Sequence, residues 1–193
     1  MPIPADPPFA VRGPLTRAAL AWARELHGGQ TRAVDRAPFI LHPLEVAALL
    51  FGRDFDDEVV AAGLLHDAVE DTDVGVDEIR ARLGDRVAEI VGALTEDVAI
   101  GDYAERKAAL REAAAAAGPD AHAVFAADKV AKARELRAQA ARAERSLDEP
   151  ELLHRLAHYE ESLRMLESVA RGLALVGQLS FELWALRELP PRP

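Results

Sequence analysis

The stretch from Gly63 to Asp73, GLLHDAVEDTD, places a histidine and several acids directly after an apolar run. On a helix, residues four apart share a face, so His66 would pair with Glu70 and Asp67 with Asp71. The two pairs would lie about 100° apart and give one broad face an imidazole and three carboxylates. That combination suits a divalent first-row ion such as Mn²⁺, Fe²⁺ or Zn²⁺.

The same acids could instead form a solvated helix end. Carboxylates near the C-terminus of a helix are unfavourable, by about 0.3–1 kcal/mol each. A positively charged group should therefore offset the negative charge of Glu70, Asp71 and Asp73. A bound metal ion and an Arg or Lys from another segment both remain open at this point.

Two further segments supply residues that a metal site needs. His42, in ILHPLE, opens a predicted helix, and Asp128, in VFAADKVAKAREL, follows an apolar stretch that should be buried. A buried carboxylate needs a partner. With His66 and Asp67, these residues would form a set of two imidazoles and two carboxylates. Such a set leaves coordination positions open for water and substrate, as catalysis requires.

Helical periodicity dominates the segments that must position these residues. Leu15, Ala19, Trp22 and Leu26 predict a first helix that ends at the glycines 28–29. The helix over residues 56–72 is apolar around most of its circumference, which predicts a central, buried position. Further helices are predicted over residues 42–52, 76–84, 85–97, 103–117 and 120–146 and from residue 150 onward. No convincing strand pattern or repeat is present, so the predicted fold class is all-α.

Length and composition limit the class of protein. The 193 residues, half of them hydrophobic, predict one domain over residues 15–190 after an irregular, proline-rich arm over residues 1–14. The absence of cysteine excludes disulfides and favours the cytoplasm. Since neither a signal peptide nor an apolar run of about 20 residues is present, we expect a soluble protein without a membrane partner.

The charge of the chain limits its ligands. A formal net charge of −10 argues against binding to a nucleic-acid polymer, which needs a basic face. A small phosphorylated nucleotide held by a few local cations remains compatible with it. The sequence makes no prediction of the oligomeric state.

Four motifs in this order and spacing carry a family resemblance: HGGQTRAVDRAPFILHPLEVAALL, AAGLLHDAVEDT, ERK and FAADKVAKARELR. The chain resembles the HD-domain alarmone hydrolases, that is, the hydrolase domain of Rel/SpoT proteins and their small stand-alone, metazoan-type SpoT homologues. The similarity runs from Ala18 to Arg137 and continues more weakly in HRLAHYEESLRMLESVARGL. It implies an all-α HD-domain helical bundle.

The resemblance also implies a reaction of the stringent response, the removal of 3′-pyrophosphate from guanosine tetra- or pentaphosphate. It assigns His42, His66, Asp67 and Asp128 to a Mn²⁺ site. It assigns Glu70 and Asp71 to water and proton transfer, and Arg32 to contact with the nucleotide. Lys129 and Lys132 are further candidates for meeting phosphate charge.

The chain departs from the family at three positions. Arg32 is followed by Ala33 in place of lysine, Pro38 by Phe39 in place of tyrosine, and Lys132 replaces an asparagine that lies by the nucleotide's sugar. Lys132 and Ala33 favour an alternative, an HD phosphohydrolase for another nucleotide. A metal-bound nucleotide sensor without turnover is a third alternative, but the intact Glu70 and Asp71 speak against it, since a sensor has no need of an acid–base pair.

The remaining histidines receive structural interpretations. His27, at a helix end, is expected to cap or pack. His122, His154 and His158 have no acid-rich partner pattern and are expected at the surface. For Arg106 and Lys107 of the ERK motif, a structural role and a phosphate-facing role are both open.

Overall fold

The computed structural model describes residues 6–11, 13–32, 35–141 and 150–188. Within these ranges the chain forms helices and no β-strand, and one isolated bridge joins Thr31 to Pro38. The all-α prediction is therefore confirmed. The chain divides into two compact units, Met1–Thr95 and Glu96–Pro193. One domain over residues 15–190 after an irregular arm stays a prediction.

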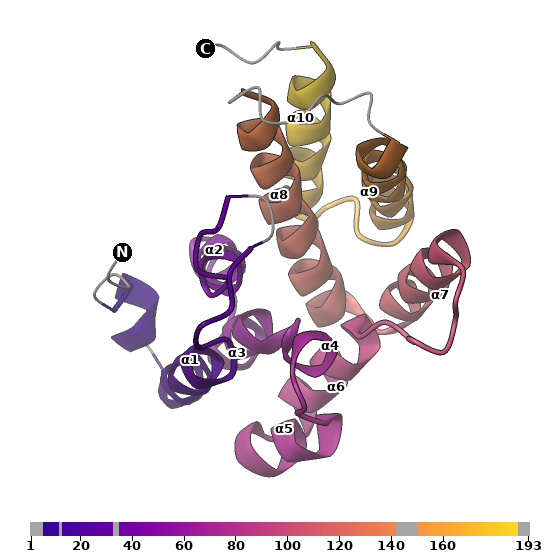
Figure 1. Ribbon diagram of the computed structural model, residues 1–193. Coiled ribbons are helices and arrows are strands. Elements are labelled where there is room, and N and C mark those ends of the chain that lie inside the picture. The colour runs from indigo at the N-terminus through magenta and orange to yellow at the C-terminus, as the bar shows by residue number, and fades with distance from the viewer. Residues whose placement is uncertain (1–5, 12, 33–34, 142–149, 189–193) are drawn as a thin grey trace. The chain divides into compact units, whose positions relative to one another are not determined.

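The first unit is built around the helix α3. Its elements are η1 (Pro8–Val11), α1 (Pro14–Leu26), α2 (Leu41–Phe51), α3 (Asp57–Leu65), α4 (Ala68–Asp71), α5 (Val76–Leu83) and α6 (Asp85–Leu94). Every residue of α3 from Val59 to Leu65 is buried, as its apolar circumference predicted. Helices α1, α2 and α6 pack against it (Figure 1).

A carboxylate ties the start of α3 to the start of α1. Asp57 accepts hydrogen bonds from the backbone N–H groups of Leu15 and Thr16, each at 2.9 Å. The first N–H groups of a helix have no partner within it, so Asp57 satisfies two of them for α1. Asp56 caps α3 itself by accepting from the N–H of Val59 at 3.1 Å. Both helices are thus fixed at their N-terminal ends.

The second unit is organised by the long helix α8. Its elements are α7 (Tyr103–Ala116), α8 (Pro119–Ala141), α9 (Pro150–Val169) and α10 (Ala174–Glu188). Residues 121–131 of α8 are all buried. Helix α10 lies along α8 (Figure 1). The end of the predicted helix over residues 120–146 falls on residues 142–146, which lie outside the described residues.

A buried ion pair fixes α10 against α8. Glu182 on α10 is 3% exposed. Its carboxylate lies 2.8 Å from Arg134 Nε and 3.0 Å from Arg137 Nη2, both on α8. A buried carboxylate is tolerated only with such partners, so these contacts specify which face of α10 meets α8.

Gly118 makes the turn between α7 and α8. Its φ is +92°, in the left-handed region that glycine enters without steric cost. Pro119 follows as the first residue of α8. The N–H that proline lacks would have no partner within the helix at this position, so no hydrogen bond is lost. The ring Nε2 of His122 donates to the carbonyl of Ala115 at 3.0 Å across this turn. His122 is buried, so its expected surface position was wrong.

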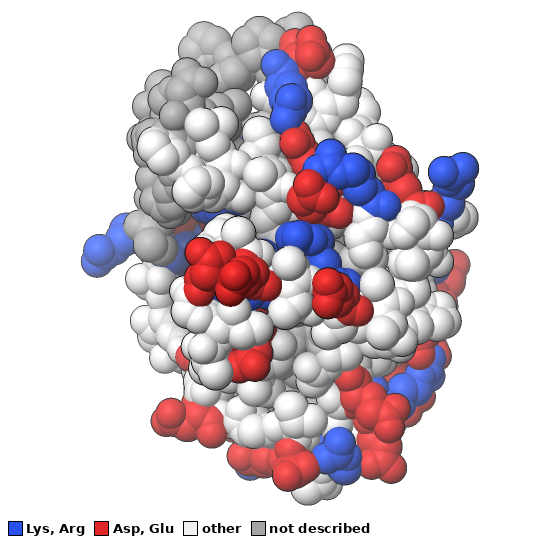
Figure 2. Space-filling view, turned by 90° about the vertical axis from the view of Figure 1, so that its right-hand side faces the viewer, with Lys and Arg blue, Asp and Glu red and all other residues white. Residues whose placement is uncertain are grey.

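The surface carries charges of both signs. Figure 2 shows Lys and Arg side chains lying among Asp and Glu side chains over the described residues of one face. Both signs are thus present on this face, and the absence of a nucleic-acid partner expected from the net charge stays a prediction. Among the described residues, no helix combines the length and apolar character needed to cross a bilayer.

Candidate active site

The histidine–aspartate pair of the opening motif lies at a break between two helices. Helix α3 ends at Leu65, and the four-residue α4 begins only after His66 and Asp67. The ψ of Asp67 is −2°, whereas a helical residue has about −42°. The predicted continuous helix over residues 56–72 was therefore wrong, because the backbone opens at Asp67.

This break gives the histidine–aspartate pair and the two acids that follow it different surroundings. His66 and Asp67 are buried, whereas Glu70 and Asp71 on α4 are exposed. The backbone N–H of Asp71 donates to the carbonyl of Asp67 at 3.0 Å, so α4 stays connected to the buried pair. The buried pair could thus hold a metal ion, and the exposed pair has access to water.

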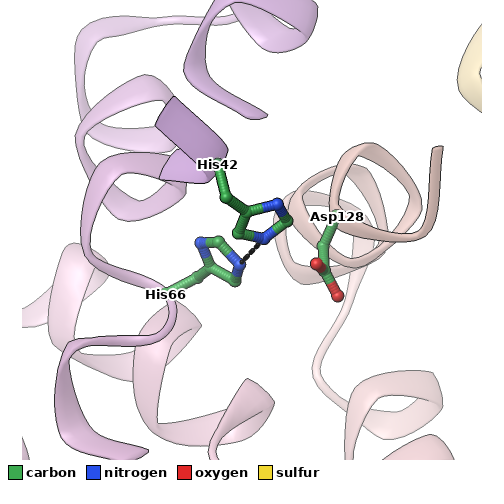
Figure 3. A group of neighbouring side chains, drawn as sticks. All are labelled: His42, His66 and Asp128. Carbon is green, nitrogen blue, oxygen red and sulfur yellow. Dashed lines mark hydrogen bonds between the residues drawn. The ribbon is translucent and has the colours of Figure 1, made fainter. Parts of the chain in front are cut away.

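Three buried side chains of the first unit converge on one point. His42, in the first turn of α2, has its Nε2 atom 3.2 Å from Nε2 of His66. The carboxylate of Asp67 lies 3.2 Å from His66 Nε2 and 3.4 Å from His42 Nε2. Figure 3 shows the two rings pointing toward one another, and also draws Asp128, which comes from α8.

The hydrogen bonding of His66 suits a metal ligand. Its Nδ1 lies 2.9 Å from the backbone carbonyl of Gly63. A carbonyl only accepts, so Nδ1 carries the hydrogen, and in the neutral ring the lone pair lies on Nε2, the atom that faces His42. Metal-binding histidines commonly donate their other N–H in this way. Two ε nitrogens and a carboxylate within 3.4 Å of one another therefore fit a divalent first-row ion.

Close packing of α2 against α3 brings the two histidines together. A Cβ atom at Gly63 would lie 2.6 Å from Leu50 Cδ1 and 3.4 Å from Val46 Cγ1, both on α2. Only a glycine allows this approach without a shift of α2 side chains. Gly63 thus places the helices and also supplies the carbonyl that orients His66.

The segment before α2 is attached to α4 through Gln30. The side-chain amide of Gln30 donates to the carbonyl of Asp71 at 3.0 Å, and its Oε1 lies 2.8 Å from His27 Nδ1. His27 is buried, with its ring 4.8 Å from that of Phe39. The packing role expected for His27 is confirmed.

Arg32, the predicted nucleotide contact, lies in the same segment. Its guanidinium donates from Nε to the carboxylate of Asp35 at 3.1 Å and also donates to it from Nη2. Asp35 accepts from the N–H of Ala37 as well, at 3.1 Å. The guanidinium is therefore held in a fixed orientation. Ala33, one of the departures from the family, lies outside the described residues.

Asp128 lies at the buried face of α8 with two lysines. Lys129 Nζ donates to Asp128 Oδ2 at 2.6 Å, and Lys132 Nζ lies 3.0 Å from Asp128 Oδ1. Lys129 is 3% exposed and also lies over the ring of Phe125, 4.5 Å from its centroid. Burial lowers the pKa of Lys129, although the charge of Asp128 opposes that shift. Lys132 thus faces Asp128, as its spacing of four residues predicted.

A cavity of about 310 Å³ in the second unit gathers cationic side chains. It is lined by Lys107, Lys129, Lys132 and Arg155, together with Tyr103, His154, His158 and Tyr159. Its size and its cations suit a phosphorylated small molecule. Lys107 of the ERK motif thus faces the cavity, while Arg106 donates to Glu96 and to the carbonyl of Ile100, each at 2.9 Å.

Sequence reasoning missed three of these residues. Arg155, His158 and Tyr159 lie within the weaker continuation of the family motifs, HRLAHYEESLR, which was the available signal. His158 is buried, so its predicted surface position was wrong, whereas His154 is exposed as predicted. Arg155 Nη2 donates to the hydroxyl of Tyr159 at 3.3 Å, and this pair stiffens one wall of the cavity.

Fold and site together define an all-helical protein with a buried histidine–aspartate centre of the kind that binds divalent metals. Residues 19–158 match the sequence profile of the HD domain, and this match extends over most of the chain. The chain therefore belongs to the HD domain family.

Curated relatives share part of this sequence. A guanosine-3′,5′-bis(diphosphate) 3′-pyrophosphohydrolase of Aquifex aeolicus is 45% identical over 78 residues, which are 40% of this chain and 11% of that protein. Its counterpart in Vibrio cholerae is 40% identical over 80 residues, 42% of this chain and 11% of that protein. The aligned stretch thus spans only about a tenth of each relative's length.

Two solved structures are similar over a larger share of the chain. A metazoan orthologue of SpoT that hydrolyses ppGpp superposes with a TM-score of 0.77 at 25% identity, covering 96% of this chain and 99% of that one. A protein of Listeria monocytogenes superposes with a TM-score of 0.67 at 28% identity, covering 77% of this chain and 97% of the other.

Proposed function

We propose that this protein is a metal-dependent hydrolase that removes the 3′-pyrophosphate from guanosine tetra- and pentaphosphate. The observation that carries the proposal is the buried cluster of His42, His66 and Asp67, whose nitrogens and carboxylate face one point. The names of the Aquifex and Vibrio relatives and the activity of the metazoan SpoT orthologue support the substrate.

We assign Asp128 as the fourth metal ligand. The family resemblance supports this assignment, and so does donor chemistry, because Asp128 is a carboxylate buried at an apolar helix face. Two imidazoles and two carboxylates leave room in the coordination shell for water and a substrate oxygen. Mn²⁺ is the ion that the resemblance favours, and the donor set also suits Fe²⁺ and Zn²⁺.

The residues of this chain divide the chemistry between them. When bound, a divalent ion polarises a phosphate oxygen and makes water more acidic. The exposed carboxylates of Glu70 and Asp71, just beyond the buried pair, orient the attacking water and carry its proton. Water attacks the phosphorus attached to the ribose 3′-oxygen, the P–O bond breaks, and the proton passes to the departing 3′-oxygen.

Cationic side chains meet the negative charge of the substrate. Lys129, Lys132, Lys107 and Arg155 surround the cavity of the second unit, and we assign them to substrate phosphates. Arg32 is assigned to the nucleotide on the basis of the resemblance, with Asp35 fixing the guanidinium. The cytoplasmic location expected from the sequence stays a prediction.

One observation favours a second candidate, an HD phosphohydrolase for a different nucleotide. Lys132 occupies the position of the family's asparagine and lies 3.0 Å from Asp128. A lysine supplies a point charge, whereas asparagine supplies hydrogen bonds to a sugar hydroxyl. A substrate with an additional phosphate near this position would gain more from the charge of the lysine than from the hydrogen bonds of an asparagine.

The test is incubation of the full chain and Mn²⁺ with a nucleotide panel, followed by product identification by ion-exchange chromatography. The panel holds guanosine and adenosine 3′-pyrophosphates and the corresponding 5′-triphosphates, with His66→Ala as the inactive control. Release of pyrophosphate from guanosine tetraphosphate supports the main proposal. Turnover of another nucleotide alone supports the second candidate, and binding without turnover would indicate a nucleotide sensor.

A further inference from the structure

One buried side chain of the second unit has no role in the hydrolysis proposed above. His158 is 5% exposed and lines the cationic cavity. It also lines an adjoining cavity of about 360 Å³. Among the described residues, no group forms a hydrogen bond with its buried Nε2 atom. Buried polar atoms are rarely left without a partner, so such an atom on a side chain that lines a cavity points to a bound group.

Arg111 determines which ring nitrogen of His158 carries the hydrogen. Arg111 Nη1 lies 2.9 Å from His158 Nδ1. A guanidinium can only donate, so Nδ1 accepts and the hydrogen of the neutral ring resides on Nε2. The unpartnered atom is therefore an N–H donor, and it requires an acceptor.

The charges around His158 select the kind of acceptor. Burial and the nearby charges of Lys129, Lys107 and Arg111 lower the pKa of His158 to about 2, so the ring stays neutral. The same positive charges favour an anionic acceptor at Nε2. The two nitrogens of an imidazole point away from each other, so Nε2 is turned away from Arg111. Arg111 lines the adjoining cavity, and His158 also lines the cationic cavity together with Lys129 and Lys107.

We propose that His158 donates its Nε2 hydrogen to a phosphate oxygen of the ligand in the cationic cavity. Arg111 is the positioning residue that keeps the hydrogen on Nε2. The identity of the ligand as an alarmone rests on the proposed function, but the phosphate contact does not. A neutral donor adds specificity here because it responds to the direction of the acceptor, whereas the surrounding lysines respond mainly to charge.

Binding of inorganic tripolyphosphate to the full chain, measured by calorimetry in EDTA, tests the contact without turnover. His158→Phe should weaken binding about 10- to 100-fold, the scale for a hydrogen bond to a charged group. His158→Gln should bind within about threefold of the wild type, since its amide can place an N–H near Nε2. Circular dichroism and thermal unfolding check that both variants fold.

Three results would overturn the proposal. They are no binding by the wild type, unchanged binding by a folded His158→Phe, and equal losses in the Phe and Gln variants. The last result would show that His158 acts by its shape and not by its N–H.

The role of Arg111 needs a control for charge alone. Arg111→Met and Arg164→Met each remove one cation, but Arg164 is exposed and pairs with Glu161. We expect weaker binding only in Arg111→Met, with recovery in Arg111→Lys. In ¹⁵N spectra of histidine-labelled protein, the hydrogen of His158 should reside on Nε2 in the wild type and be shared between both nitrogens in Arg111→Met. Equal losses in the two Met variants, or an unchanged spectrum, would contradict a positioning role.

The outcome is separable from that of the proposed function. If tripolyphosphate binding follows the expected pattern while no guanosine alarmone is hydrolysed, the phosphate contact stands and the alarmone assignment fails. If alarmones are hydrolysed but tripolyphosphate binding is unchanged by substitution of His158, the alarmone assignment stands and the phosphate contact fails.

Discussion

At the scale of single residues, the site separates groups that can hold a metal from groups that can move a proton. His42, His66 and Asp67 are buried and within hydrogen-bonding range of one another, whereas Glu70 and Asp71 are exposed. Burial makes the first set costly to leave without a partner, and exposure gives the second set access to water. The two sets should therefore respond differently to substitution.

Asp67→Asn should abolish activity and lower the metal content of the purified protein. The amide is a weaker ligand than the carboxylate and carries no charge to offset a divalent ion. Elemental analysis measures the metal, and Asp73→Asn, an exposed acid a few residues away, is the matched control. Near-normal metal content in both Asp67→Asn and His66→Ala would rule out this cluster as the metal site.

Glu70→Gln should reduce turnover by about 10²–10⁴, the usual contribution of general acid–base catalysis. Metal content and substrate affinity should change much less, because Glu70 lies outside the buried cluster. Steady-state kinetics with elemental analysis separate the two effects, with Glu78→Gln on α5 as the control. A variant that loses its metal but regains full activity on reconstitution would identify Glu70 as a ligand.

Lys132→Asn should reduce the preference for the more highly charged substrate. Lys132 Nζ lies 3.0 Å from Asp128 at the cationic cavity, so its removal takes one positive charge from the cavity to which we assign the substrate phosphates. The measurement is kcat/KM for guanosine pentaphosphate against tetraphosphate, with the wild type beside the variant. An unchanged ratio at unchanged absolute values would assign Lys132 to a purely structural pairing with Asp128.

At the scale of elements, ion pairs hold the helices that carry the cavity residues. Glu96, at the start of the second unit, pairs with Arg106 and with Lys107 of α7. Burial tends to raise the pKa of Glu96, but the hydrogen bonds and charges of Lys107 and Arg106 outweigh burial and hold it below its ordinary value of 4.5. This contact therefore orients Lys107 at the cavity wall as well as anchoring α7.

Glu96→Gln should destabilise the protein at neutral pH but not in acid. A carboxyl group with a lowered folded-state pKa contributes stability above its unfolded-state pKa, and that contribution is lost as the pH falls through the folded-state pKa. The difference in unfolding free energy between wild type and Glu96→Gln should thus be constant near pH 7 and shrink below about 4.5. Urea unfolding across this pH range measures it; a difference that stays constant into acid would contradict the assignment.

At the scale of the whole molecule, binding of a single ion by the proposed ligands His42, His66, Asp67 and Asp128 should stabilise the folded chain. An ion that binds only the folded chain stabilises it by about 2.7 kcal/mol at a concentration 100 times its Kd. Adding Mn²⁺ should therefore raise the Tm of the EDTA-treated wild type. The increase should be lost in His66→Ala and also in Asp128→Asn.

Asp120→Asn, in the first turn of α8, is the control for a carboxylate lost from the same helix. Differential scanning calorimetry with and without Mn²⁺ gives the comparison. A full Mn²⁺-dependent increase of the Tm in Asp128→Asn would remove Asp128 from the ligand set.

The sequence by itself determined the helical class, most helix boundaries and the chemical type of the site. Apolar residues at helical spacing make α3 central, and Gly118 with Pro119 separates α7 from α8, because these effects act between near neighbours in the chain. The pairing of His66 and Asp67 and the match of Lys132 to Asp128 likewise follow from short spacings. Family motifs then indicated the reaction.

Only the tertiary structure decided how distant residues meet and which of them are buried. The break at Asp67 follows no local propensity, and the approach of His42 to His66 depends on the packing of α2 against Gly63. The burial of His158 and its contact with Arg111 likewise need α9 to lie against α7. Such contacts join residues far apart in the chain, and their free energy depends on side-chain packing that cannot be predicted from the local sequence.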